Sequence, residues 1–279
     1  MRIFEFKDRL IPLDKWVQNG VEVLVENYRE LFQVVKVPIE KILQGLDWAL
    51  NILPPSVVML FFVLVAWRYA GKRVSIFSLA TLLTVGYLGL WDETMTTLSM
   101  VLCSVMFCAI LGIPLGIMAG RSDRFEMFLR PMLDVMQTTP PFVYLVPVVM
   151  LFSIGNVSGV LATIVFALPP LIRLTSLGIR SVHPELVEAA TAFGATPFQL
   201  LCRVQVPLAL PSVMAGFNQT IMMSLSMVVI AALIGAGGLG GPVVRGLNTL
   251  DIGLATVAGL CIVLIAMVLD RISQGMAKR

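Results

Sequence analysis

The chain has 279 residues, of which 58% are hydrophobic and only 13% are charged, and its mean hydropathy is +0.91. Soluble domains carry about 45–50% apolar and about 25% charged residues, so a soluble fold would lack the polar surface to cover this much apolar material. The composition therefore predicts a protein whose main solvent is lipid. The net charge of +3, without any run of Lys or Arg, argues against a nucleic-acid partner.

Chemistry-bearing groups are sparse along the chain. The four cysteines (Cys103, Cys108, Cys202 and Cys261) form no CxxC pair, so we expect neither a disulfide framework nor a zinc site. No Ser/His/Asp or Cys/His set appears, which argues against a membrane enzyme. The first nine residues hold no apolar run, so no cleavable signal peptide is expected. No metal or other cofactor is predicted.

Residues 1–50 form the most polar part of the chain, and we expect an external or interfacial tail there. Apolar residues recur at helical spacing from Val21 to Val35 and again after Pro38, with charged residues on the other face. The pattern predicts two amphipathic helices separated by a break at Pro38, lying in the membrane interface. A small soluble helical hairpin is the alternative.

Apolar stretches dominate from residue 51 onward, and each spanning helix needs about 20 such residues. The fourth and fifth candidates are interrupted by prolines, which membrane helices tolerate at kinked or cavity-lining positions. We expect an all-α protein with two additional spans in 51–94 and a core in 95–279. The seven candidate spans are 52–68, 74–91, 95–119, 132–153, 157–177, 212–235 and 252–270.

Basic residues orient the predicted bundle. They gather in the turn after the first span, in the 120–131 loop, after the fifth span and at the C-terminus, whereas the alternate loops hold only Arg245. Basic loops stay in the cytoplasm. The pattern therefore predicts a cytoplasmic C-terminus and, with seven spans, an external N-terminal tail. The residues concerned are Arg68, Lys72, Arg73, Arg121, Arg124, Arg130, Arg173, Arg180, Arg203, Arg271, Lys278 and Arg279.

The longest predicted cytoplasmic loop, 178–210, contains an ordered set of helix signals. Pro184 followed by Glu185 favours a helix start, because proline fits the first turn and an acid suits the N-terminal dipole. Gly194 is placed to end that helix, and Pro197 permits a second short helix that ends at Pro207. The sequence predicts a helix–turn–helix elbow projecting into the cytoplasm, and a plain connection is the alternative.

This loop closely resembles the coupling motif of the permeases of ATP-binding-cassette importers. The motif requires Glu-Ala-Ala, a glycine four residues on, and then two aliphatic residues before a proline. The chain supplies these residues in register, with valine where the family often has isoleucine or leucine. The motif residues are Glu188, Ala189, Ala190, Gly194, Val204, Val206 and Pro207.

The wider text is similar to the glycine betaine, proline and choline branch of that family, at 137–141 and 234–240. The resemblance implies a five-helix type I importer core, a homodimer in the bacterial inner membrane and a role in osmoprotection. It also implies a cytoplasmic ATPase dimer that receives the elbows and an external substrate-binding protein. The chain has no GxxxxGK[ST] phosphate loop, so ATP hydrolysis is expected in the ATPase subunit and not here.

The stretch from Gly235 to Gly240 matches GxGxxG, but a dinucleotide site would need a strand before it and an acid about 20 residues on. A membrane span precedes it and Pro242 follows. We therefore interpret this stretch as a closely packed, flexible external turn.

Ionisable residues are almost absent from the span interiors, whereas ion-coupled carriers usually need them. Uncharged polar residues do cluster in the sixth span, where they could line a path or join helices as polar contacts. The candidate path residues are Asn218, Gln219, Met222, Met223 and Ser226. The expected function is ATP-driven import of a compatible solute. An ion-coupled secondary transporter or a channel is the alternative.

Overall fold

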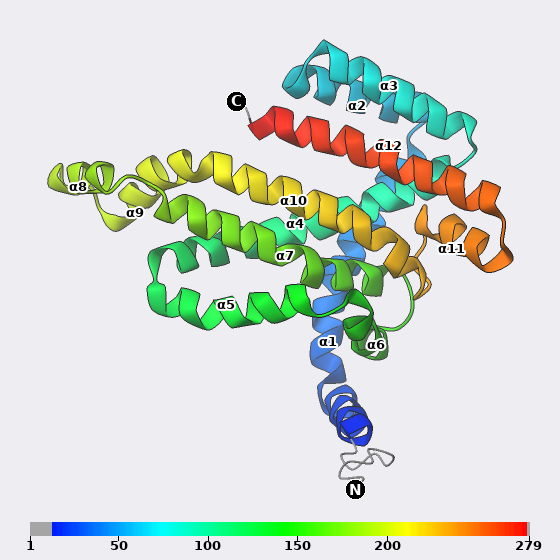
Figure 1. The fold of residues 1–279 in the computed structure, drawn as a ribbon, viewed down its shortest axis with the longest axis horizontal. Coiled ribbons are helices and arrows are strands. Elements are labelled where there is room, and N and C mark those ends of the chain that lie inside the picture. The colour runs from blue at the N-terminus through cyan, green and yellow to red at the C-terminus, as the bar shows by residue number, and fades with distance from the viewer. Residues whose placement is uncertain (1–12, 278–279) are drawn as a thin grey trace, which may run out of the picture.

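A computed structural model describes residues 13–277, and no strand occurs among them, which confirms the all-α prediction. Figure 1 shows long helices running side by side, with one helix crossing them. The helices are α1 (Leu13–Ile52), α2 (Pro55–Ala70), α3 (Lys72–Tyr87), α4 (Trp91–Arg121), α5 (Asp123–Thr138), α6 (Pro141–Phe152), α7 (Asn156–Arg180), α8 (Pro184–Ala192), α9 (Pro197–Leu200), the π-helix η1 (Leu201–Gln205), α10 (Val206–Ala232), α11 (Gly240–Thr249) and α12 (Ile252–Ala277).

Four of the described helices, α4, α7, α12 and the continuous α9–α10 segment, are long and apolar enough to cross a membrane alone. Small residues bring them close together. Gly116 of α4 faces Thr175 of α7 so closely that an added Cβ would lie 2.5 Å from the Thr175 Cβ. Such small-residue contacts are typical of membrane helix pairs, where backbones approach for van der Waals packing.

The fourth predicted span is a broken helix. α5 and α6 are bent by 99° at the prolines between them, and together they can form one span. The expected loop at 120–131 is wrong for residues 123–131, which are helical. The local reason is a helix start at Ser122, whose hydroxyl accepts a hydrogen bond from the Phe125 backbone N–H at 3.3 Å.

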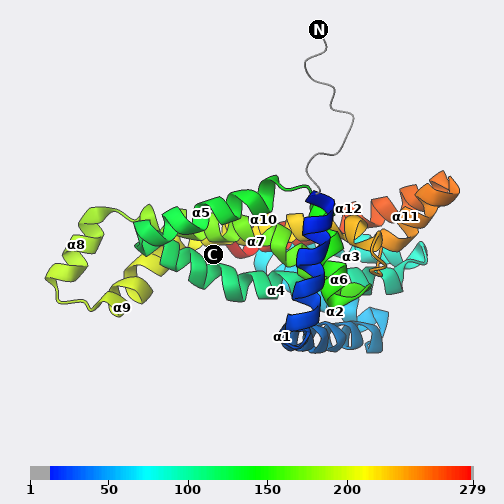
Figure 2. The ribbon, with the colours of Figure 1, turned by 90° about the horizontal axis from the view of Figure 1, so that it is seen from below.

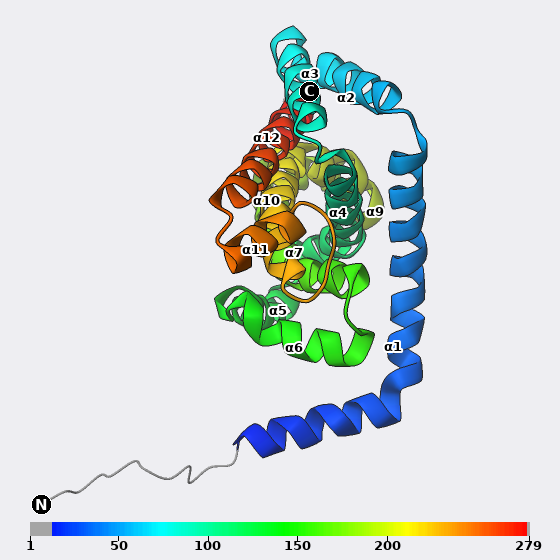
Figure 3. The ribbon, with the colours of Figure 1, turned by 90° about the vertical axis from the view of Figure 1, so that its right-hand side faces the viewer.

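Leu13–Ile52 form one helix of 40 residues, α1, so the expected break at Pro38 is wrong. Pro38 is exposed, while Ile39 and Leu43 beside it are buried against the core, which holds the helix together across the proline. Figure 3 shows a single bend in α1 and its long upper part lying along one flank of the bundle. Residues 1–12 and several side chains of the first predicted amphipathic helix lie outside the described part.

The two additional predicted spans are the helices α2 and α3, which pack against each other. Each has 16 residues, which at 1.5 Å per residue gives about 24 Å. That is shorter than the hydrocarbon core of about 30 Å. α2 is joined to the second part of α1 at a bend of 108°. If this pair counts as one span and α5–α6 as another, the described residues give up to six spans.

The basic helix ends and the glycine-rich turn lie at opposite ends of the bundle. In Figures 1 and 2 the ends of α4 and α7 and the start of α5, which hold Arg121, Arg180 and Arg124, lie on the side from which α8 and α9 project. At the opposite end, the turn at Gly237 and Gly238 contacts Thr96, Thr97 and Asn156. The basic and the glycine-rich loops are therefore separated by the length of the bundle.

Candidate functional site

The predicted elbow is present, with α8 as a short helix and α9 as the start of a second one. The expected end of that second helix at Pro207 is wrong, because Pro207 lies in the first turn of α10, where a proline fits a helix. α8 begins at Pro184 and ends in a Schellman turn, because the Gly194 N–H donates to the Thr191 carbonyl at 2.9 Å and the Ala195 N–H to the Ala190 carbonyl at 3.0 Å. Gly194 has φ +79°, which glycine adopts without strain. The sequence signals at Pro184 and Gly194 thus lie at the two ends of α8.

α9 starts with a capping box, in which Thr196 and Gln199 exchange side-chain and backbone hydrogen bonds. It continues through the π-helix η1 into α10 without a turn. The motif residues are divided among these elements: Glu188, Ala189 and Ala190 lie on α8, Gly194 in the turn, Val204 in η1, and Val206 and Pro207 at the start of α10.

The elbow exposes apolar side chains far from the bundle. No residue of α8 or α9 is buried, and Phe193 and Phe198 are 94% and 73% exposed. Figure 2 shows both helices projecting beyond the ends of α5, α7 and α10. Large aromatic groups left in this position are typical of a surface that meets another protein. We did not single out Phe193 and Phe198 from the sequence, although a phenylalanine beside a turn glycine in a polar loop was a usable signal.

The candidate path residues of α10 fall into two groups. Gln219, Met222 and Ser226, spaced by three and four residues, are exposed along one stripe of the helix. Asn218 is half-buried against α12, where its amide donates to Asp270 Oδ1 at 3.0 Å and accepts from the Ser273 hydroxyl. Met223 is also half-buried and packs on the core. The structure therefore brings only three of the five onto an open face.

The glycine-rich stretch forms a packed turn between α10 and α11, a helix that the sequence analysis did not predict. The Gly237 N–H donates to Asn156 Oδ1 at 2.6 Å, and the Leu239 N–H donates to Thr97 Oγ1 at 2.8 Å. Gly238 has φ +81°, and an added Cβ would lie 2.5 Å from Thr97 Oγ1. The glycines serve close packing on α4 and α7.

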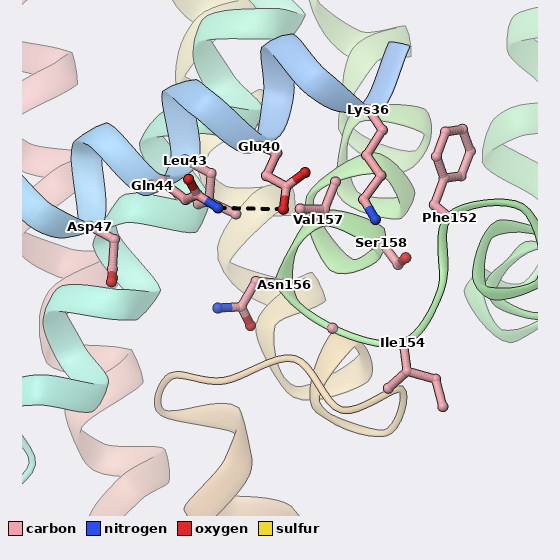
Figure 4. Close-up of a pocket in the computed structure, with 11 residues that line it drawn as sticks. Lys36, Glu40, Leu43, Gln44, Asp47, Phe152, Ile154, Asn156, Val157 and Ser158 are labelled. Atoms are coloured by element: carbon pink, nitrogen blue, oxygen red, sulfur yellow. Dashed lines mark hydrogen bonds between the residues drawn. The ribbon is translucent and has the colours of Figure 1, made fainter. Parts of the chain in front are cut away.

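A cavity of about 430 Å³ lies beside this turn, between α1 and the α6–α7 connection. Figure 4 shows Lys36, Glu40 and Asp47 projecting into it from α1, with Asn156 on the opposite wall. Asp47 also accepts a hydrogen bond from Ser99 of α4 at 3.2 Å. The polar flank of α1 therefore faces the protein, while Val34, Val37 and Trp48 are exposed. No group of three or more possible metal ligands occurs among the described residues.

Long apolar helices, a broken span and an exposed elbow define a polytopic membrane protein of the transport-permease class. The chain belongs to the family of binding-protein-dependent transport system inner membrane components, whose model matches residues 112–279. This family consists of transport permeases, so the chain is a multi-pass protein of the inner membrane.

The chain is 51% identical over 273 residues to the glycine betaine/proline betaine transport system permease protein ProW of Escherichia coli, covering 98% of this chain and 77% of ProW. It is 40% identical to the glycine betaine transport system permease protein OpuAB of Bacillus subtilis, covering 96% of this chain and 95% of OpuAB. A further relative is the trimethylamine N-oxide permease TmoV of Pelagibacter ubique, at 41% identity over 81% of this chain and 32% of TmoV.

The fold is similar to a chain of the MetNI methionine ABC transporter in an inward-facing conformation. The TM-score is 0.58, and the match covers 65% of this chain and 91% of that chain. At 22% identity this likeness concerns the fold alone. It agrees with the importer-type core expected from the sequence.

Proposed function

We propose that this chain forms, with a second copy, the membrane path of an importer for a small quaternary-ammonium compatible solute, with glycine betaine as the first candidate. The substrate class rests on the names of the relatives ProW, OpuAB and TmoV. A zwitterion suits a path with few charges, because its carboxylate and ammonium leave no unpaired charge to be matched by the protein. A separate binding protein delivers the solute.

A separate cytoplasmic ATPase dimer supplies the energy, and each elbow docks into one ATPase subunit. The observation that carries this proposal is the exposure of Phe193 at 94% on a rigid turn beyond the bundle. Glu188 and Ala189 are exposed beside it on α8, and Ala190 is small enough to permit close approach of a partner surface. Docking of the ATPases then moves the elbows and opens the path in alternation.

The stripe of Gln219, Met222 and Ser226 faces the path between the two copies in this proposal. Its support is the helical spacing of three open side chains on α10, the helix that continues directly from the elbow. Asn218 instead joins α10 to α12, which is the role of polar groups that hold membrane helices together. An ion-coupled carrier is not favoured, because the chain belongs to a binding-protein-dependent family.

The orientation places the elbow and C-terminus in the cytoplasm and α1 at the outer surface. α1 contacts α4 at Ser99 and Cys103, and from Cys103 to Arg121 the α4 helix rises about 27 Å at 1.5 Å per residue. That rise is close to the thickness of the hydrocarbon core, about 30 Å. If Arg121 lies at the cytoplasmic surface of the membrane, α1 therefore lies near the outer surface. Residues 1–50 are thus an interfacial tail, 51–94 two added helices and 95–279 the core, with coupling loop 178–210.

The test of the coupling role is Gly194→Trp in the complex reconstituted with its ATPase and binding protein. An added Cβ at Gly194 meets nothing within 4 Å in this chain, so the new side chain has room and would project toward a docked partner. The positive φ of Gly194 adds backbone strain at the turn. We expect normal insertion and loss of uptake. Gly259→Ala, at an equally open glycine inside α12, is the control and leaves uptake unchanged. Normal uptake by Gly194→Trp would remove the elbow from the mechanism.

A further inference from the structure

Arg180 occupies the junction between the elbow and the membrane helices. It is the last residue of α7, and three residues separate it from Pro184, where α8 begins. Its guanidinium contacts Asp123 Oδ1 at 2.6 Å and Glu126 Oε2 at 2.8 Å, both in the first part of α5. It also donates to the Ala119 carbonyl of α4 at 2.8 Å. One side chain at the base of the elbow thus joins the ends of three helices.

α4 and α7 do not depend on the Arg180 contacts to stay together, because their backbones already pack closely. An added Cβ at Gly120 would lie 2.8 Å from the Ile179 Cβ, one turn beyond the similar contact of Gly116 with Thr175. The two helices therefore move as one body, since a packed interface of this kind does not deform gradually.

α5 is held much more loosely. Only Leu129 and Leu133 of α5 are buried, and Met127, Phe128 and Met132 face outward. A cavity of about 360 Å³ lies between α5 and α7, and its wall includes the buried Ser176 hydroxyl, which has no hydrogen-bond partner in the part of the chain that the structure describes. Charged contacts bridge this gap where packing does not, at Arg180 and at the Arg173–Asp134 pair, whose atoms lie 2.6 Å apart.

α5 leads through Pro140 into α6, which reaches the far end of α10. Leu145 of α6 is buried in one cluster with Met227 of α10, and Ile230 packs against the same cluster. Ala162 of α7 belongs to the same cluster, so α6 contacts both α7 and α10 there. A displacement of α5 therefore reaches the external half of α10 through α6, in addition to any movement carried by the α4–α7 pair.

We propose that Arg180 is the positioning residue that passes movement of the elbow to α5 and α6, and hence to the external end of the path. The contacts of Arg180 with Asp123, Glu126 and Ala119 form a latch. This inference rests on the proposed docking of the elbow to an ATPase. Movement of the elbow is then transmitted in two ways: through the covalent connections to α7 and α10, and through the charged contacts of Arg180 with α5.

The test is Arg180→Gln in the reconstituted complex, with uptake and ATP hydrolysis measured in the same vesicles. Losing partly exposed ion pairs lowers coupling modestly, so we expect uptake per ATP to fall about threefold to tenfold while binding-protein-stimulated hydrolysis persists. Arg180→Lys keeps the charge and recovers part of the ratio. Arg124→Gln is the matched control, because Arg124 is exposed near the start of α5, next to Asp123, and has no ion pair among the described residues.

A double-mutant cycle separates transmission from general damage. Asp123→Asn with Glu126→Gln should reproduce the uncoupling, and combining these with Arg180→Gln should add little, since all three groups act in one contact. A wild-type ratio of uptake to hydrolysis in both Arg180→Gln and the Asp123/Glu126 variant would overturn the latch. Equal loss of hydrolysis and uptake would also overturn it, because Arg180 would then only hold the elbow in place. Normal uptake by Gly194→Trp would instead reject the docking proposal on which the latch rests.

Discussion

Asn218 and Asp270 join α10 to α12, with the Asn218 amide nitrogen 3.0 Å from Asp270 Oδ1. Gln274 donates to the same carboxylate at 2.8 Å and 2.9 Å, so Asp270 lies among hydrogen-bond donors at the basic end of the bundle. The Ser273 hydroxyl completes the cluster by donating to Asn218 Oδ1. The Asn218 amide therefore makes hydrogen bonds to two groups of α12.

The first prediction follows from this contact. Asn218→Leu should lower the free energy of unfolding by about 1–3 kcal/mol, because Asp270 and Ser273 each lose a half-buried partner. The melting temperature of the purified protein in detergent measures this loss. Gln219→Leu, one residue along and exposed, should leave the melting temperature unchanged and instead alter uptake. An unchanged melting temperature with lost uptake for Asn218→Leu would place Asn218 in the path.

The second prediction concerns the aromatic tip of the elbow. Phe193→Ser should weaken association with the ATPase by about 30-fold or more, the cost of about 2 kcal/mol or more typical of a buried interface anchor. Binding of the purified ATPase to the permease in lipid nanodiscs measures the change. Thr191→Ala, exposed on the same helix with its hydroxyl bonded to its own backbone, is the control. Equal affinity for the wild type and Phe193→Ser would exclude Phe193 from the interface.

The third prediction is topological and uses a native residue. Cys202 is exposed in η1, while Cys103, Cys108 and Cys261 are buried, so only Cys202 should react readily with a maleimide. A membrane-impermeant maleimide should not label intact cells and should label them after permeabilisation. In Cys202→Ser with Asn248→Cys, where Asn248 is an exposed residue of α11, the new cysteine should be labelled already in intact cells. Labelling of Cys202 in intact cells would invert the orientation.

The fourth prediction concerns the depth of α1 in the membrane. Trp48 is 66% exposed on the face of α1 that points away from the bundle. With the other three tryptophans replaced by phenylalanine, its fluorescence should be quenched most by lipids brominated near the headgroup. Stronger quenching by lipids brominated at the chain ends would place α1 in the bilayer centre and contradict the interfacial position.

The elbow was predictable because its signals are local. Pro184 begins α8, Gly194 takes a positive φ after it, and Thr196 with Pro197 starts α9, all of which depend on neighbouring residues. The apolar stretches likewise placed the long helices, because hydropathy is also a local property.

The parts that the sequence analysis missed depend on contacts between distant residues. α1 continues through Pro38 because Ile39 and Leu43 are buried against the core, which no pattern within the tail encodes. The partner of Asn218 lies 52 residues away on α12. A polar residue in an apolar helix gives the same sequence signal whether it faces a path or another helix.

Uptake of labelled glycine betaine tests the central claim most directly. The complex of this chain with its ATPase would be placed in vesicles, with ATP on the side of the ATPase and the binding protein on the other. The account predicts accumulation that requires both ATP and the binding protein, and that Gly194→Trp abolishes. Accumulation driven by a sodium or proton gradient without ATP, or uptake unaffected by Gly194→Trp, would contradict it.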